Sequence, residues 1–240
     1  MAKMTKKEYT RKRLFFGVLI FVALALIITG IAIWLLFSLL GASMGGGITV
    51  AEVAMSPISF TSLQIDGNEV EDGQTVDAGF VFDSLYGDDT GRVTWNGTSS
   101  EKMSITVSGV VMGAQHLSRF SYILMLPQGV IDAAAKGYLD ISDFYEMETG
   151  LYKENILSLA DNGTMVTDGT NSAWRFNFEI TIKWGERFQG LNPSVYFDTL
   201  GLGEPIEDVV STLNDLHDTV VAGSSGNPMY TLTLTASPNN

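Results

Sequence analysis

The sequence contains no cysteine among its 240 residues. That absence excludes a disulfide framework, a thiolate metal site and a cysteine nucleophile. Only two histidines are present, His116 and His217, and their wide separation disfavours a histidine-rich metal site or a local Ser/His pair. Basic residues are scarce as well: 14 Lys and Arg against 27 Asp and Glu give a net charge of −13, which argues against a nucleic-acid-binding surface. No convergent catalytic set stands out, so we expect a protein that is not an enzyme.

The few basic residues are concentrated at the N-terminus. Residues 1–13 carry six cations against Glu8, a net +5, and the remainder of the chain therefore carries −18. Residues 14–40 follow without a single charge. Because about 20 apolar residues cross a bilayer, this stretch predicts one transmembrane helix, with membrane lipid as its partner. The preceding cations place the N-terminus in the cytoplasm and the C-terminal domain outside the cell.

Two alternatives to a retained membrane anchor remain open. A signal peptide cleaved near Ser43 would release a secreted protein, but secretory apolar regions usually span about 7–15 residues, so the length favours a signal anchor. A pilin-like subunit would instead pack residues 14–40 inside a filament core, although no prepilin cleavage signature precedes Leu14. The anchor interpretation divides the chain into a basic cytoplasmic tail, a transmembrane helix, a Gly-rich joint with an extended segment, and an extracellular domain: 1–13, 14–40, 41–57 and 58–240.

The exported part has the pattern of a β protein. Residues 174–184 alternate apolar and polar side chains, and residues 103–107 repeat the pattern, as half-buried antiparallel strands do. Turn dipeptides such as Asp66-Gly67 separate the expected strands. Two short helices are expected over 130–136 and 205–216, the second because its apolar residues recur at helical spacing. The pattern predicts an all-β fold, a two-sheet β-sandwich with one or two short helices.

The order of several short motifs resembles the TasA/camelysin-like family of exported bacterial jelly-roll proteins, which form biofilm matrix fibres. The segments that carry the resemblance are Val93–Gly97, Met103–Val111, Leu126-Pro127, the run at 133–138, Phe176–Phe178, Lys183–Gly185, Phe188–Pro193, Tyr196-Phe197, the helix at 205–216 and the terminal strand. The resemblance implies a jelly-roll-like sandwich that is assembled into extracellular fibres or retained at the cell surface. It also implies that an extended N-terminal segment completes the sheet of a neighbouring subunit.

The candidate donor strand lies between the glycine joint and the domain. Residues 48–60 are β-branched and extended, and a free strand of this kind can add to an exposed sheet edge. The residues proposed to dock are Ile48, Val50, Val53, Met55, Ile58 and Phe60. The alternative is that this segment pairs within its own domain as the first strand. On the first interpretation the protein is a cell-surface or matrix structural protein, a fibre subunit or its membrane anchor, whose partners are copies of itself or related surface proteins.

The sequence offers two further kinds of candidate site. Exposed aromatic residues in loops could stack on sugar rings and make the domain a carbohydrate-binding or adhesion module; the candidates are Tyr86, Trp95, Tyr145 and Tyr152. Acidic turns could bind Ca²⁺ through their carboxylates; the candidates are Glu69, Glu71 and Asp72 in one turn and Asp83, Asp88 and Asp89 in another. Neither acidic stretch has EF-hand spacing, and turn geometry alone explains Asp and Gly there. We therefore expect no cofactor.

Overall fold

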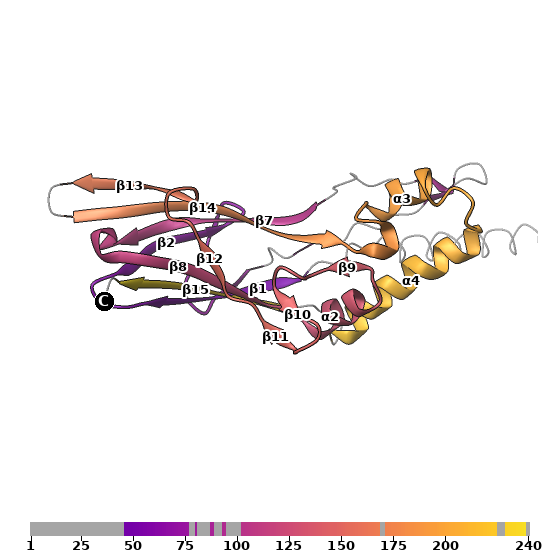
Figure 1. The fold of residues 1–240 in the computed structure, drawn as a ribbon, viewed down its shortest axis with the longest axis horizontal. Coiled ribbons are helices and arrows are strands. Elements are labelled where there is room, and N and C mark those ends of the chain that lie inside the picture. The colour runs from indigo at the N-terminus through magenta and orange to yellow at the C-terminus, as the bar shows by residue number, and fades with distance from the viewer. Residues whose placement is uncertain are drawn as a thin grey trace, which may run out of the picture.

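The domain consists mainly of β-strands arranged in two large sheets that lie face to face, with helices beyond one end (Figure 1). The computed structural model describes residues 46–76, 80, 87–88, 93–94, 102–168, 171–224 and 229–238. The expected membrane helix at 14–40 lies outside these ranges. Within them, no helix is both long and apolar enough to cross a membrane.

The first sheet has five strands and brings both ends of the described chain together. Its order is β12 (Asn155–Leu157), β8 (Leu117–Met125), β15 (Met229–Pro238), β1 (Gly47–Ala54) and β4 (Thr75–Val76). The strand β1 runs parallel to the C-terminal strand β15, whereas the other strand pairings in the described part of the chain are antiparallel.

The second sheet is built around its longest strand, β14 (Asn171–Trp184). Its order is β13 (Gly163–Asp168), β14, β7 (Lys102–Met112), β2 (Ser59–Ile65) and β3 (Asn68–Glu69), and β9 (Leu139–Asp140) also pairs with β14. Two small ribbons complete the strands: β10 (Tyr145–Glu146) with β11 (Leu151–Tyr152), and β5 (Gly87–Asp88) with β6 (Val93–Thr94). Along β14, buried and more exposed residues alternate over the whole length, which confirms the predicted strand.

Aromatic side chains from both sheets form the core between them. The ring of Phe120 on β8 lies 4.9 Å from those of Trp174 and Phe176 on β14, and 6.1 Å from that of Phe60 on β2. Face-to-face sheets interdigitate side chains in this way, about 10 Å apart. The contacts hold β8 of the first sheet against β14 and β2 of the second.

The helices lie beyond one end of the sheets, and the C-terminal end of β15 lies at the other end (Figure 1). They are α2 (Gln128–Ala135), α3 (Pro193–Thr199) and α4 (Ile206–Gly223), with short 3₁₀ turns η1 (Ala114–His116) and η2 (Glu186–Phe188). The chain approaches itself closely where α2 meets α4, because a Cβ on Gly129 would lie 2.3 Å from the carbonyl oxygen of Val220. A glycine is therefore required at position 129.

The structure confirms the two predicted helices and extends one of them. The helix expected at 205–216 continues to Gly223, because Val220 prolongs the buried stripe that Val209, Leu213 and Leu216 begin. The turn at Asp66-Gly67 is also confirmed: both residues have positive φ, 49° and 80°, as a two-residue hairpin turn requires. The short helix α3 was not predicted.

Candidate assembly strand and the polar networks

The segment predicted as a donor strand is divided between the two sheets. Its first part forms β1, in which Val50 lies beside Leu232 and Ala51 beside Thr233 of β15. The chain then turns at residues 55–58 and enters β2 in the other sheet. The structure thus has the alternative arrangement, in which this segment is the first strand of its own domain.

The six candidate docking residues differ accordingly in their surroundings. Ile48 and Val50 are fully buried on the inner face of β1, and Ile58 and Phe60 pack in the core from the second sheet. Val53 and Met55 are 41% and 50% exposed, because the chain leaves the core after the middle of β1. Of the candidate residues on β1, Ile48 and Val50 therefore form its buried face.

The other edge of β1 is covered by a short segment only. The strand β4 pairs with β1 at Thr49 and Ile48, and the preceding turn adds hydrogen bonds from Gly73 N to Val50 O (2.7 Å) and from Glu52 N to Asp72 Oδ1 (2.9 Å). Burial, and then the neighbouring charge of Asp72, raises the pKa of Glu52. Asp72, one of the candidate calcium ligands, thus accepts a backbone hydrogen bond from β1.

The candidate sugar-stacking and calcium residues are only partly within the described ranges. Tyr86 and Trp95 lie outside them, as do Asp83 and Asp89. Tyr145 and Tyr152 face each other across the β10–β11 ribbon with rings 5.1 Å apart, and the Tyr152 hydroxyl donates to the carbonyl oxygen of Leu126 (3.0 Å). These two tyrosines are thus half-buried and packed on each other. Across the described residues, no group of three or more His, Asp or Glu side chains is placed to hold a metal ion.

An open cleft of about 680 Å³ lies beside this ribbon. Tyr145, Asp140, Glu148 and Lys153 are among its lining residues. Several polar groups in it already have partners: Lys153 Nζ donates to the carbonyl oxygen of Ser142 (2.7 Å), and Asp140 Oδ1 accepts from Ser142 N (3.0 Å). The two histidines do not contribute, since His116 ends η1 and His217 lies on α4 beside Asp218.

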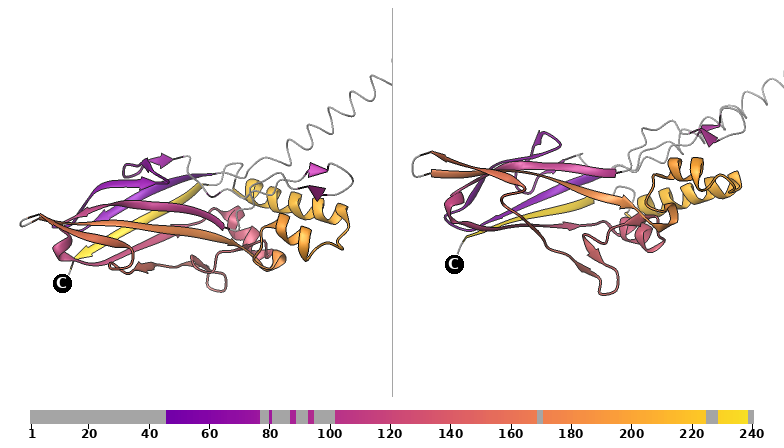
Figure 2. Two further views of the ribbon diagram at one scale, coloured as in Figure 1. Left: turned by 90° about the horizontal axis from the view of Figure 1, so that it is seen from above. Right: turned by 45° about the horizontal axis from the view of Figure 1, so that its top comes forward.

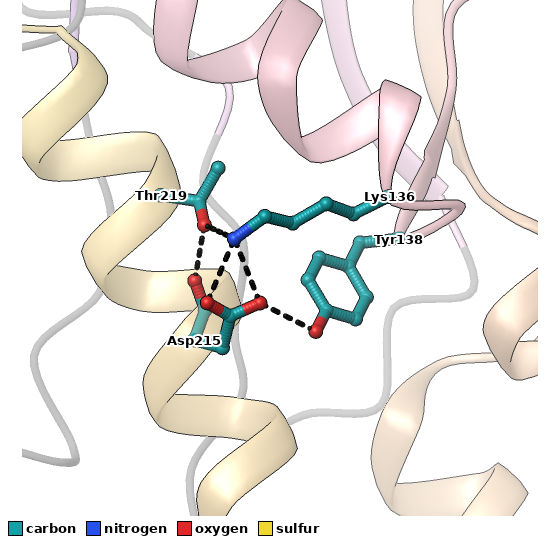
Figure 3. A network of polar contacts seen from close by, with 4 residues as sticks. All are labelled: Lys136, Tyr138, Asp215 and Thr219. Carbon is teal, nitrogen blue, oxygen red and sulfur yellow. Dashed lines mark hydrogen bonds and ion pairs between the residues drawn. The ribbon is translucent and has the colours of Figure 1, made fainter.

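A polar network that sequence reasoning did not find joins α4 to the end of α2 (Figure 3). The Lys136 ammonium donates to both carboxylate oxygens of Asp215 (2.7 and 2.9 Å) and to Thr219 Oγ1 (2.8 Å). The Tyr138 hydroxyl donates to Asp215 Oδ2 (2.7 Å). Hydrogen bonds from Lys136, and then from Tyr138, lower the pKa of Asp215, while burial and the bond to Asp215 raise that of Tyr138 to about 12.

A second network holds the loop before α4. The Arg187 guanidinium makes a two-pronged ion pair with Glu204 (2.8 and 3.3 Å), and the Tyr196 hydroxyl donates to Glu204 Oε1 (3.0 Å). Arg187 also lies 5.6 Å from the ring centre of Tyr196 and 5.7 Å from that of Phe197. A planar guanidinium suits both contacts. The arrangement connects η2, α3 and the loop before α4, and we assign it a structural role.

The Asp215 network predicts how stability depends on pH. Since folding lowers the pKa of Asp215 below its ordinary 3.8, its contribution is fully present above that value and is lost as the pH falls through the folded pKa. Because Lys136 and Asp215 are each 45% exposed, Asp215→Asn is expected to lower the free energy of unfolding by only about 1 kcal/mol at pH 7. Urea unfolding should show this difference shrinking below pH 4, whereas a constant difference would contradict the assignment. The exposed neighbour Asp218→Asn is the control.

No protein-family description, curated protein or solved structure matches this chain. The fold and its contacts therefore carry the functional argument.

Proposed function

We propose that this chain is a non-enzymatic structural protein of a bacterial cell surface or extracellular matrix, and that copies assemble by donating β1 to one another. Residues 14–40 anchor the chain in the membrane, and the domain, a jelly-roll-like sandwich, lies outside. The observation that supports strand donation is the position of β1, which runs parallel to β15 and is covered on its other side only by the two-residue β4 and the turn before it, among the residues that the structure describes. The uncharged run and the cations before it support the anchor.

Donation of β1 preserves the contacts that hold it in place. If the chain opens at residues 55–58, β1 of one copy can occupy the same position beside β15 of another. Ile48 and Val50 then fill the same buried positions, so the exchange loses few interactions. Exchange of an identical element between copies is a low-cost route to assembly for this reason. The acidic domain surface keeps copies apart elsewhere.

A disulfide between β1 and β15 can report both the exchange and the location. Ala51 and Thr233 are neighbours on the outer, half-buried face, and adjacent strands lie about 4.8 Å apart, within disulfide range. Cells would express two full-length chains with different tags, one Ala51→Cys and the other Thr233→Cys. We expect disulfide-linked mixed dimers in intact cells, because disulfides persist outside the reducing cytoplasm. Because the natural chain has no cysteine, no other thiol competes.

The outcomes separate the two parts of the proposal. Mixed dimers that appear only after lysis and oxidation would contradict the extracellular location but not the exchange. Strand donation would be wrong if mixed dimers never form while a single chain carrying both cysteines closes an internal disulfide. Thr181→Cys replaces Thr233→Cys as the control, because Thr181 is a half-buried strand residue of the other sheet and should give few dimers.

A further inference from the structure

The strand β13 is the longest edge strand in the described part of the two large sheets. It has six residues, whereas the other edges, β12, β4 and β3, have three, two and two. The hairpin of β13 and β14 also extends past the end of the facing sheet (Figure 2). Natural proteins usually shorten, charge or cover such edges, because unpaired backbone groups are a template for another strand. Gly163–Thr167 contains no charged residue, and among the residues that the structure describes no further strand pairs with this edge.

The register of the hairpin determines which backbone groups point outward. Asn177 N donates to Asn162 O at 2.9 Å, and Gly163 lies beside Phe176, so Asn162 and Asn177 are opposite each other. Hydrogen-bonded pairs alternate with non-bonded pairs along an antiparallel ladder. The N–H and C=O groups of Thr164 and Val166 therefore point to β14, and those of Gly163, Met165 and Thr167 point to the free edge.

This set of outward groups is complementary to itself. The three residues are spaced by two and are symmetric about Met165. If a second copy approaches antiparallel with its Met165 opposite Met165, then Gly163 of each copy pairs with Thr167 of the other. Each of the three residue pairs then makes two hydrogen bonds, and every outward group of the edge is used. A two-fold axis through Met165 closes the arrangement at two copies.

The side chains and charges favour a second copy as the partner. Met165 and Val166 are 49% and 40% exposed, and the pairing would place the two Met165 side chains next to each other on one face. Gly163–Thr167 carries no charge, in a chain whose net charge is −13. A basic partner would find no carboxylate between Gly163 and Thr167, and another copy would meet no like charge over those five residues.

We infer that β13 pairs with β13 of a second copy, in register about Met165, and joins two second sheets into one continuous sheet. This inference deepens the proposed self-assembly, since the partner is again a copy of the chain, but it uses a different edge from β1. The two contacts together would let one copy bind others both through β1 and through β13.

Cysteine cross-linking of the full chain tests the register. Residues opposite each other in a hydrogen-bonded antiparallel pair have Cα atoms about 5.5 Å apart, which a disulfide can bridge. On mild oxidation, Met165→Cys is expected to form disulfide dimers at least tenfold faster than Ile156→Cys. Ile156 lies on the edge strand β12 and is more exposed, at 64%, so it measures random collision. Equal rates for the two variants would overturn the inference.

A charge at the axis gives a second, independent measurement. Met165→Asp brings two carboxylates together and is expected to weaken the association measured by sedimentation velocity to what β1 alone supports, whereas Ile156→Asp leaves it unchanged. Equal association of the two variants would refute the pairing. In the same Met165→Asp chain, the mixed Ala51–Thr233 disulfide should still form. If that disulfide forms but the Met165→Cys dimer does not, strand donation stands and this inference fails. If the Met165→Cys dimer forms but that disulfide does not, this inference stands and strand donation fails.

Discussion

Replacing Trp174 by alanine is expected to lower the free energy of unfolding by roughly 3–5 kcal/mol, the range found for large aromatic residues removed from a core. Trp174 is completely buried on β14, and its ring lies 4.9 Å from Phe120 of the facing sheet. Its indole Nε1 also donates to the carbonyl oxygen of Leu159 (2.9 Å), which the substitution leaves without that donor. The cavity would therefore lie between the two sheets.

Urea denaturation followed by circular dichroism measures this loss. Leu151→Ala is the control, because Leu151 is 63% exposed and its truncation should change the free energy of unfolding by less than about 0.5 kcal/mol. Trp174→Phe keeps an aromatic ring but loses the indole N–H, and an intermediate loss is expected. If Trp174→Ala costs no more than Leu151→Ala, the two sheets do not meet at this ring.

The regular elements could be predicted because their periodicity is local. The eleven-residue alternation at 174–184 has one explanation, a strand with one face buried, and β14 has that pattern. The stripe of Val209, Leu213 and Leu216 equally required a helix with one face against the protein. The sequence therefore indicates that strands and helices exist and which faces they bury.

The sequence does not indicate which strand lies beside which. Residues 48–54 have the same apolar pattern whether they pair with β15 of their own chain or of another, so the pattern left both alternatives open. The sequence does not reveal the free edge of β13 for the same reason, because the position of β13 at an edge depends on the order of strands in the sheet. The network at Asp215 joins residues far apart in the chain, Lys136 and Asp215 at a separation of 79 residues, and that at Arg187 joins Arg187 to Glu204 at a separation of 17. No spacing rule points to either network.

An aspartate at position 50 is expected to release β1 from the sheet. Val50 is fully buried in the hydrophobic core, so Val50→Asp would bury a charge among apolar side chains or expel the strand. We expect a loss of roughly 4 kcal/mol or more in the free energy of unfolding, together with loss of the mixed Ala51–Thr233 disulfide, because the docking position beside β15 is the same whichever copy supplies the strand.

The adjacent residue provides a matched control for Val50→Asp. Ala51→Asp places the same charge one residue further along β1, on its half-exposed outer face, and should change the free energy of unfolding by less than about 1 kcal/mol. Amide hydrogen exchange can follow the strand itself: in Val50→Asp, the amides of β1 and of its neighbour β15 should lose protection, while those of β14 keep more of theirs. Equal effects of the two substitutions would mean that β1 does not insert a buried face beside β15. A stable Val50→Asp domain that still forms mixed dimers would mean that assembly does not use this strand at all.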